Sequence, residues 1–175
     1  MKKLKLSSKI FLFIFVLSLI IWIGGYLTRI SITYQLFERI NYQLKPFING
    51  QNLAAILRIL YIPTVITFVA YIVLIVSFTL FISTAKVGLK KNGWLFIITL
   101  IIYITLPFEI YLMKYDYNFL LLTVGNNLEN TVAINLIISR FKSLNGFPII
   151  ELLSYFSIIY FALFQPFKIE EKIVR

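Results

Sequence analysis

Four long apolar stretches constrain what this chain can fold into. A helix that crosses a bilayer needs about 20 apolar residues, and each segment in lipid has to satisfy its own backbone hydrogen bonds. The chain is 60% hydrophobic and 14% charged, whereas a soluble domain is about 25% charged. We therefore expect one integral membrane domain, residues 1–175, in which four helices span the membrane. The predicted spans are 10–28, 62–84, 94–113 and 149–167.

Basic residues at the ends of these stretches predict the orientation. Lysines precede the first span and follow the last, and "KVGLKKNG" places Lys86, Lys90 and Lys91 in a tight turn between the second and third spans. Cytoplasmic ends of spans are enriched in Lys and Arg. We expect both termini in the cytoplasm, most simply of a bacterial or archaeal cytoplasmic membrane. These three lysines are also candidates to contact anionic lipid headgroups, although such a turn is more often a topology signal.

The N-terminal segment has a second interpretation. A basic start, an apolar centre and the small residues Gly24 and Gly25 are also typical of a secretory signal. We expect a retained first span.

The two longer connections carry amphipathic patterns. In residues 32–45, Ile32, Leu36, Ile40 and Leu44 recur every fourth position, and residues 130–144 show a similar apolar side. Such spacing predicts a helix with one apolar face. The predicted fold is an all-α bundle of four transmembrane helices with an amphipathic interfacial helix in each of the two outer loops.

The halves of the chain show weak similarity at an offset of 85 residues. "YLTR" at 26–29 matches "YLMK" at 111–114, Asn41 matches Asn126, and Pro63 matches Pro148. Repeated helical hairpins are one way in which transporters are built. A generic pattern of helical hairpins explains the same matches, so both interpretations stay open.

Two carboxylates lie near the outer ends of the predicted spans. Glu109 is close to the end of the third span and Glu151 close to the start of the fourth, and Arg29 and Lys114 are candidate partners. Ionisable residues inside a membrane are default indications of function. These four residues are predicted to form either an ion or proton site or a structural ion-pair site. We expect interfacial pairing, because a polar loop is only a few residues from each carboxylate.

A seven-residue spacing of small residues and one proline predicts a packing seam on the second span. The seam comprises Pro63, Ala70, Ser77 and Thr84. Small residues on one stripe let a neighbouring helix approach closely.

The residue inventory limits the function. Cysteine and histidine are both absent. No phosphate loop, nucleophile elbow or zinc-protease motif is present, so we expect no catalytic residues, no metal and no cofactor. The net charge is +10, but much of the excess lies beside the spans, which favours topology over nucleic-acid binding.

These observations predict a non-catalytic accessory or scaffold subunit of a larger integral membrane complex, with lipids and other membrane subunits as partners. One alternative is a small solute or ion transporter or channel built from two repeated hairpins. Another is a lipid-binding or lipid-modifying membrane protein.

Overall fold

The fold is all-helical in a computed structural model that describes residues 4–38, 42–85, 87–89, 92–124, 129–144 and 146–167. Five helices make up almost all of these residues, and no sheet is present among them. The helices are α1 (Leu6–Leu36), α2 (Gly50–Ala85), α3 (Gly93–Val124), α4 (Asn130–Ser143) and α5 (Phe147–Phe164).

Four of the helices have the length and apolarity needed to cross a membrane. They are α1, α2, α3 and α5, with 31, 36, 32 and 18 residues. At 1.5 Å per residue, the first three are each about 45–55 Å long, longer than the ~30 Å hydrocarbon layer of a bilayer. These three helices extend beyond the spans predicted from the sequence. The four apolar stretches therefore identify a multi-pass membrane protein, although three of their helices are longer than expected.

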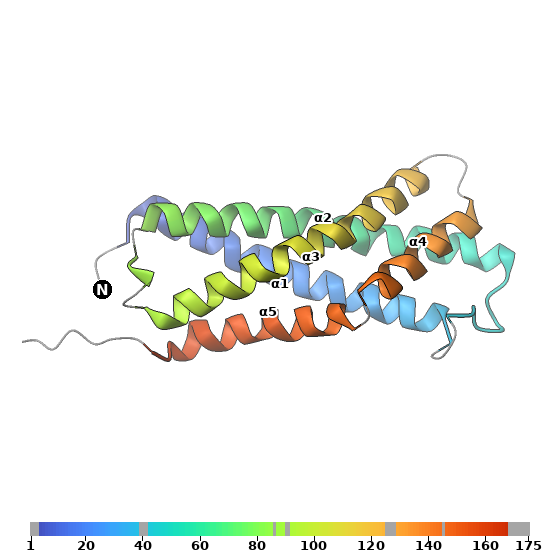
Figure 1. Ribbon diagram of the computed structural model, residues 1–175. Coiled ribbons are helices and arrows are strands. Elements are labelled where there is room, and N and C mark those ends of the chain that lie inside the picture. The colour runs from blue at the N-terminus through green and yellow to red at the C-terminus, as the bar shows by residue number, and fades with distance from the viewer. Residues whose placement is uncertain are drawn as a thin grey trace, which may run out of the picture.

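The long helices run alongside one another (Figure 1). The start of α1 and the end of α2 meet where the Ser8 hydroxyl donates to Thr84 Oγ1 at 3.2 Å. At the same end, the backbone N–H of Gly93 donates to the carbonyl of Phe167 at 3.2 Å. The short helix α4 packs against α3 and α2 at the opposite end.

Two apolar clusters form the core. The first joins α1, α2, α3 and α5, and at its centre the Trp22 ring lies 4.6 Å from Tyr155 and 5.8 Å from Tyr71 between ring centroids. The second lies at the end where α4 packs, around Leu57 and Ile137. Between them lie the charged residues described below.

The predicted helix over residues 32–45 is wrong. Nothing between Tyr26 and Leu36 breaks the helix, so α1 continues to Leu36 and takes up the first part of that pattern. The chain then folds back on itself. Phe37 and Leu44 form an antiparallel bridge, and the N–H of Lys45 donates to the carbonyl of Leu36 at 3.0 Å. Burial of Leu36 and Phe37 in the second core cluster holds this turn in place.

The predicted helix over residues 130–144 corresponds to α4, which covers Asn130–Ser143. Ala133, Ile137 and Arg140 are its buried residues, and their spacing of four and three places them on one face.

Pro63 lies inside α2. A proline within a helix leaves nearby carbonyls without their usual donor. Threonine hydroxyls bond two carbonyls here: Thr67 donates to Pro63 O at 2.9 Å and Thr64 donates to Leu60 O at 2.8 Å. The carbonyl that loses its donor to the proline is that of Ile59, four residues earlier, so these hydroxyl bonds reinforce the adjoining turns of the helix.

Candidate ion-pair site

Five ionisable side chains from four helices gather between the two core clusters. We call them the charged cluster: Arg29 from α1, Glu109 and Asp116 from α3, Arg140 from α4, and Glu151 from α5. Four of them have almost no exposed surface, with 3% for Glu109 and Asp116, 4% for Arg140 and 0% for Glu151. Arg29 is half-buried.

Asp116 binds both arginines of the cluster. Its Oδ2 accepts a hydrogen bond from Arg29 Nη1 at 2.9 Å, and its Oδ1 accepts one from Arg29 Nη2. The Nε of Arg140 donates to both carboxylate oxygens, at 2.8 and 3.0 Å. One carboxylate therefore joins α1, α3 and α4 through charge-assisted bonds, which are the strongest hydrogen bonds in proteins.

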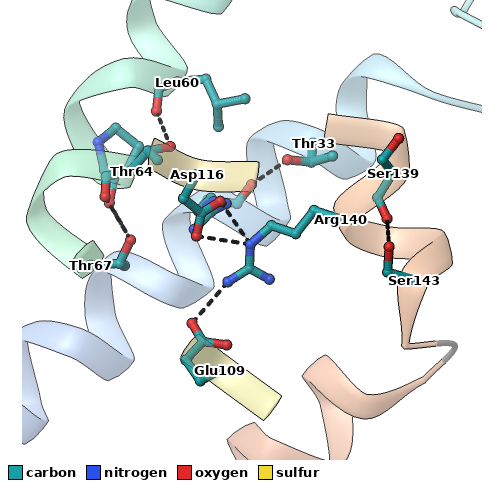
Figure 2. A network of polar contacts seen from close by, with 11 residues as sticks. Thr33, Leu60, Thr64, Thr67, Glu109, Asp116, Ser139, Arg140 and Ser143 are labelled. Carbon is teal, nitrogen blue, oxygen red and sulfur yellow. Dashed lines mark hydrogen bonds and ion pairs between the residues drawn. The ribbon is translucent and has the colours of Figure 1, made fainter. Parts of the chain in front are cut away.

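Arg140 reaches from α4 to two carboxylates of α3 (Figure 2). While its Nε binds Asp116, its Nη2 donates to Glu109 Oε1 at 2.9 Å. Glu109 and Asp116 are seven residues apart, which is close to two helical turns, so both project from the same face of α3. The planar fork of an arginine suits such a double contact, which a single ammonium group does not reproduce.

The environment of Arg140 favours its charged form. Burial alone would lower the pKa of the guanidinium, but the negative charges of Asp116 and Glu109 outweigh burial and raise that pKa well above its usual range. Arg140 also lies over the ring of Tyr26, with 5.6 Å from Cζ to the ring centroid. Arg140 is thus a permanent buried cation.

Glu151 differs from the other members of the cluster. Neither of its carboxyl oxygens has a hydrogen-bond partner, and the same is true of Glu109 Oε2. The two carboxyl groups lie close enough to each other to share a hydrogen bond. The indole N–H of Trp22 and the hydroxyl of Tyr26 are also buried without a partner.

The structure brings together three of the four residues that the sequence singles out for this site. Glu109, Glu151 and Arg29 belong to the charged cluster, but Lys114 is exposed on α3 and lies outside it. The sequence predicts that both glutamates form ion pairs at the interface: Glu109 pairs with Arg140, whereas Glu151 has no cationic partner, and both are buried. Neighbouring helices cover both of them, because α3 continues past residue 113 and α4 packs onto it.

Asp116 and Arg140 are the members that sequence reasoning missed. Both lie outside the predicted spans, in a connection between the third and fourth of them. Two signals point to them: Asp116 follows Glu109 by seven residues, and Arg140 continues the face formed by Ala133 and Ile137 on a predicted amphipathic helix.

The predicted packing seam lies on α2. Pro63, Ala70 and Ser77 are buried and Thr84 is half-buried. At Gly25 of α1, an added Cβ would lie 2.9 Å from Thr67 Cγ2 and 3.8 Å from Pro63 O, so the two helices approach closely beside Pro63. The three lysines predicted to contact lipid, Lys86, Lys90 and Lys91, lie outside the described residues.

The residues matched by the proposed repeat lie in different surroundings. Pro63 is inside a helix, whereas Pro148 begins one. Tyr26 is buried, and its counterpart Tyr111 is exposed. Asn41 and Asn126 are not among the described residues.

Two small cavities border the charged cluster. The first lies beside Arg29, Asp116 and Arg140, and the second beside Tyr26 and the same two arginines. Each has room of about 10 Å³, which is enough for one water molecule. Within the part of the chain that is described, no three carboxylates come close enough to hold a metal ion.

No protein-family model, curated protein or solved structure matches this chain.

Proposed function

We propose that this protein is a non-catalytic accessory or scaffold subunit of a larger integral membrane complex. The observation that carries this proposal is the exposed apolar surface of α5. Only 22% of the 18 residues of α5 are buried, against 39% of an apolar stretch of α2 of the same length, and α5 packs mainly on α3. Its exposed residues include Ile149, Ile150, Leu153, Leu163 and Phe164, each at least 60% exposed.

The charged cluster supports a structural role. Asp116 and Arg140 tie α1, α3 and α4 together. Removing one partner of a buried ion pair costs about 3–5 kcal/mol, so such a cluster strongly favours one arrangement of the helices. The adjoining cavities are too small for a solute larger than water. A rigid unit with an unpartnered face suits a scaffold.

The proposal includes a membrane topology. We place α1, α2, α3 and α5 as a four-helix bundle, with the start of α1 and the end of α5 on the cytoplasmic side and α4 in the outer interface. The Ser8–Thr84 and Gly93–Phe167 bonds support the shared end, because they join the elements expected at the cytoplasmic surface. Lys86, Lys90 and Lys91 would then face anionic headgroups on that side.

Purification from native membranes tests the proposal. The full-length chain, tagged and expressed at its natural level, is extracted in mild detergent and analysed by native mass spectrometry. We expect other integral membrane proteins at a fixed stoichiometry. Photo-crosslinking groups at Leu153 and Leu163 of α5 should form adducts with those proteins. Matched groups at Ile66 and Val69, exposed on α2, are the control positions and should react mainly with lipid.

A second candidate is a small ion or solute transporter. The observation in its favour is that Glu109 and Glu151 are buried together within helices expected to span the membrane. If the chain purifies as a single component and moves protons or solute in liposomes, and Glu151→Gln abolishes that movement without loss of folding, the scaffold proposal is wrong and the transporter is supported.

A further inference from the structure

Glu151 lies in a position where its charge has no counterpart. It is 0% exposed, and neither carboxyl oxygen has a partner. A buried carboxylate without compensation is among the most costly arrangements in a protein. Glu109 offers a candidate acceptor: its Oε1 accepts a hydrogen bond from Arg140, and its Oε2 has no partner.

The balance of charge in the cluster indicates which of its three carboxyl groups is neutral. Arg29 and Arg140 supply two positive charges. Asp116 and Glu109 supply two negative charges, and both accept bonds directly from these arginines. Two positive and two negative charges balance. Glu151 is a third carboxyl with no cation assigned to it, so the cluster is neutral only if Glu151 is neutral.

We infer that Glu151 is a proton-binding site, in which the neutral carboxyl group keeps one proton and donates a hydrogen bond through it to Glu109 Oε2. This bond satisfies the free oxygen of Glu109 and leaves Glu109 charged for Arg140. A hydrogen bond between two carboxyl groups requires that one of them carries a proton. Glu109 and Glu151 lie close enough to each other for such a bond. The ligand of the site is a proton, with no metal or organic group involved.

Each helix of the described chain contributes a titratable or charged group that lies near enough to interact electrostatically with Glu151. Glu109 and Asp116 come from α3, Arg140 from α4, Tyr26 from α1 and Tyr71 from α2, and Tyr155 lies one turn further along α5. Among these, Tyr26 has a buried hydroxyl without a partner. If Glu151 loses its proton, two carboxylates face each other across the contact between α3 and α5. Binding and release of the proton therefore bear on how tightly α5 packs.

The inference does not depend on the proposed function, since it follows from burial and charge balance alone. Infrared spectroscopy of the full-length protein in detergent or lipid vesicles tests it directly. At neutral pH we expect the carbonyl band of a protonated carboxyl group, shifting in heavy water, and disappearing at higher pH. The band should be absent in Glu151→Gln, which resembles the neutral acid in shape, and present in Glu38→Gln, which changes an exposed residue.

Thermal unfolding as a function of pH gives a second, independent readout. A folded chain that holds a proton which the unfolded chain has released becomes less stable as pH rises, by up to tenfold in the unfolding equilibrium constant per pH unit. The wild type should lose stability as pH rises. In Glu151→Gln the pH dependence of stability should be smaller by the contribution of one proton.

Several results would overturn the inference. It is wrong if the wild type shows no acid band at neutral pH, or if the band persists in Glu151→Gln. Stabilisation by sodium at constant pH, without an acid band, would identify a bound cation in place of the proton.

Discussion

At the scale of the residue, Arg140 and Asp116 hold the charged cluster together. Arg140 is one side chain on a short helix, yet it binds Asp116 and Glu109 of α3 and lies over Tyr26 of α1. Asp116 holds Arg140 together with Arg29. The stability of the arrangement should therefore depend strongly on these two residues, and the first two predictions test each of them separately.

Asp116→Asn should strongly destabilise the protein. The variant leaves Arg29 and Arg140 without their shared counter-charge, and loss of one partner in a buried pair costs about 3–5 kcal/mol. Glu38→Gln makes the same kind of change at an exposed carboxylate and should alter stability by less than about 0.5 kcal/mol. Unfolding in detergent, followed by circular dichroism, measures both. Equal stability of the two variants would show that the buried cluster does not hold the helices together.

Arg140→Lys should also destabilise the protein, although it preserves the charge. An ammonium group cannot bind Asp116 and Glu109 with the geometry of the guanidinium, and a lost hydrogen bond to a charged group costs about 1.5–3 kcal/mol. The control is the reverse exchange, Lys142→Arg, on the same helix. Lys142 is exposed and lies over the Tyr42 ring at 5.5 Å, a contact that arginine retains. The same unfolding assay should rank Arg140→Lys well below Lys142→Arg, and a reversed ranking would contradict the prediction.

The sequence identifies only part of this cluster. Glu109, Glu151 and Arg29 stand out because they lie in or beside apolar runs. Asp116 and Arg140 lie among polar residues, where a charge usually means solvent exposure. Their burial depends on the docking of α4 onto α3, a contact between separate elements that no local pattern specifies.

At the scale of the element, the ends of the apolar stretches do not coincide with the ends of the helices. The apolar runs locate the four long helices. A helix, however, ends where its backbone hydrogen bonding ends, and this point need not be the last hydrophobic residue. In α1 and α3 the helix continues through polar residues, and in α2 it continues through Pro63. The prediction of a separate helix over residues 32–45 failed for this reason, whereas α4 begins directly after Glu129, whose backbone is extended, and its bounds agree with the predicted 130–144 within one residue.

Close packing of α1 on α2 gives a third prediction. Thr67 cannot readily turn its methyl group away from Gly25, because its hydroxyl bonds the carbonyls of Pro63 and Thr64. Gly25→Ala should therefore incur an overpacking cost of about 1–3 kcal/mol. Gly24→Ala is the matched control: its added Cβ meets nothing within 4 Å, so it should stabilise the helix by up to about 1 kcal/mol. Thermal unfolding in detergent compares the two, and a Gly25→Ala variant as stable as Gly24→Ala would refute the close contact.

At the scale of the whole molecule, the two ends have different compositions. The end formed by the start of α1 and the connection from α2 to α3 carries clustered lysines in the sequence. The opposite end carries the turn after α1 and the docked helix α4, with the charged cluster buried beneath it. Such asymmetry is typical of a protein that lies in the membrane in one orientation.

Single introduced cysteines test this orientation with little background, because the chain has no cysteine of its own. Gly88, Gln51 and Glu129 are exposed positions in three different connections or helix starts. With the lysine-rich end in the cytoplasm, a membrane-impermeant maleimide added to intact cells should label Gln51→Cys and Glu129→Cys. It should label Gly88→Cys only after the membrane is opened, because the bilayer would lie between that turn and the reagent. Labelling of Gly88→Cys in intact cells, together with protection of the other two, would invert the proposed topology. Labelling of all three in intact cells would mean that the helices do not separate two sides of a membrane in this arrangement.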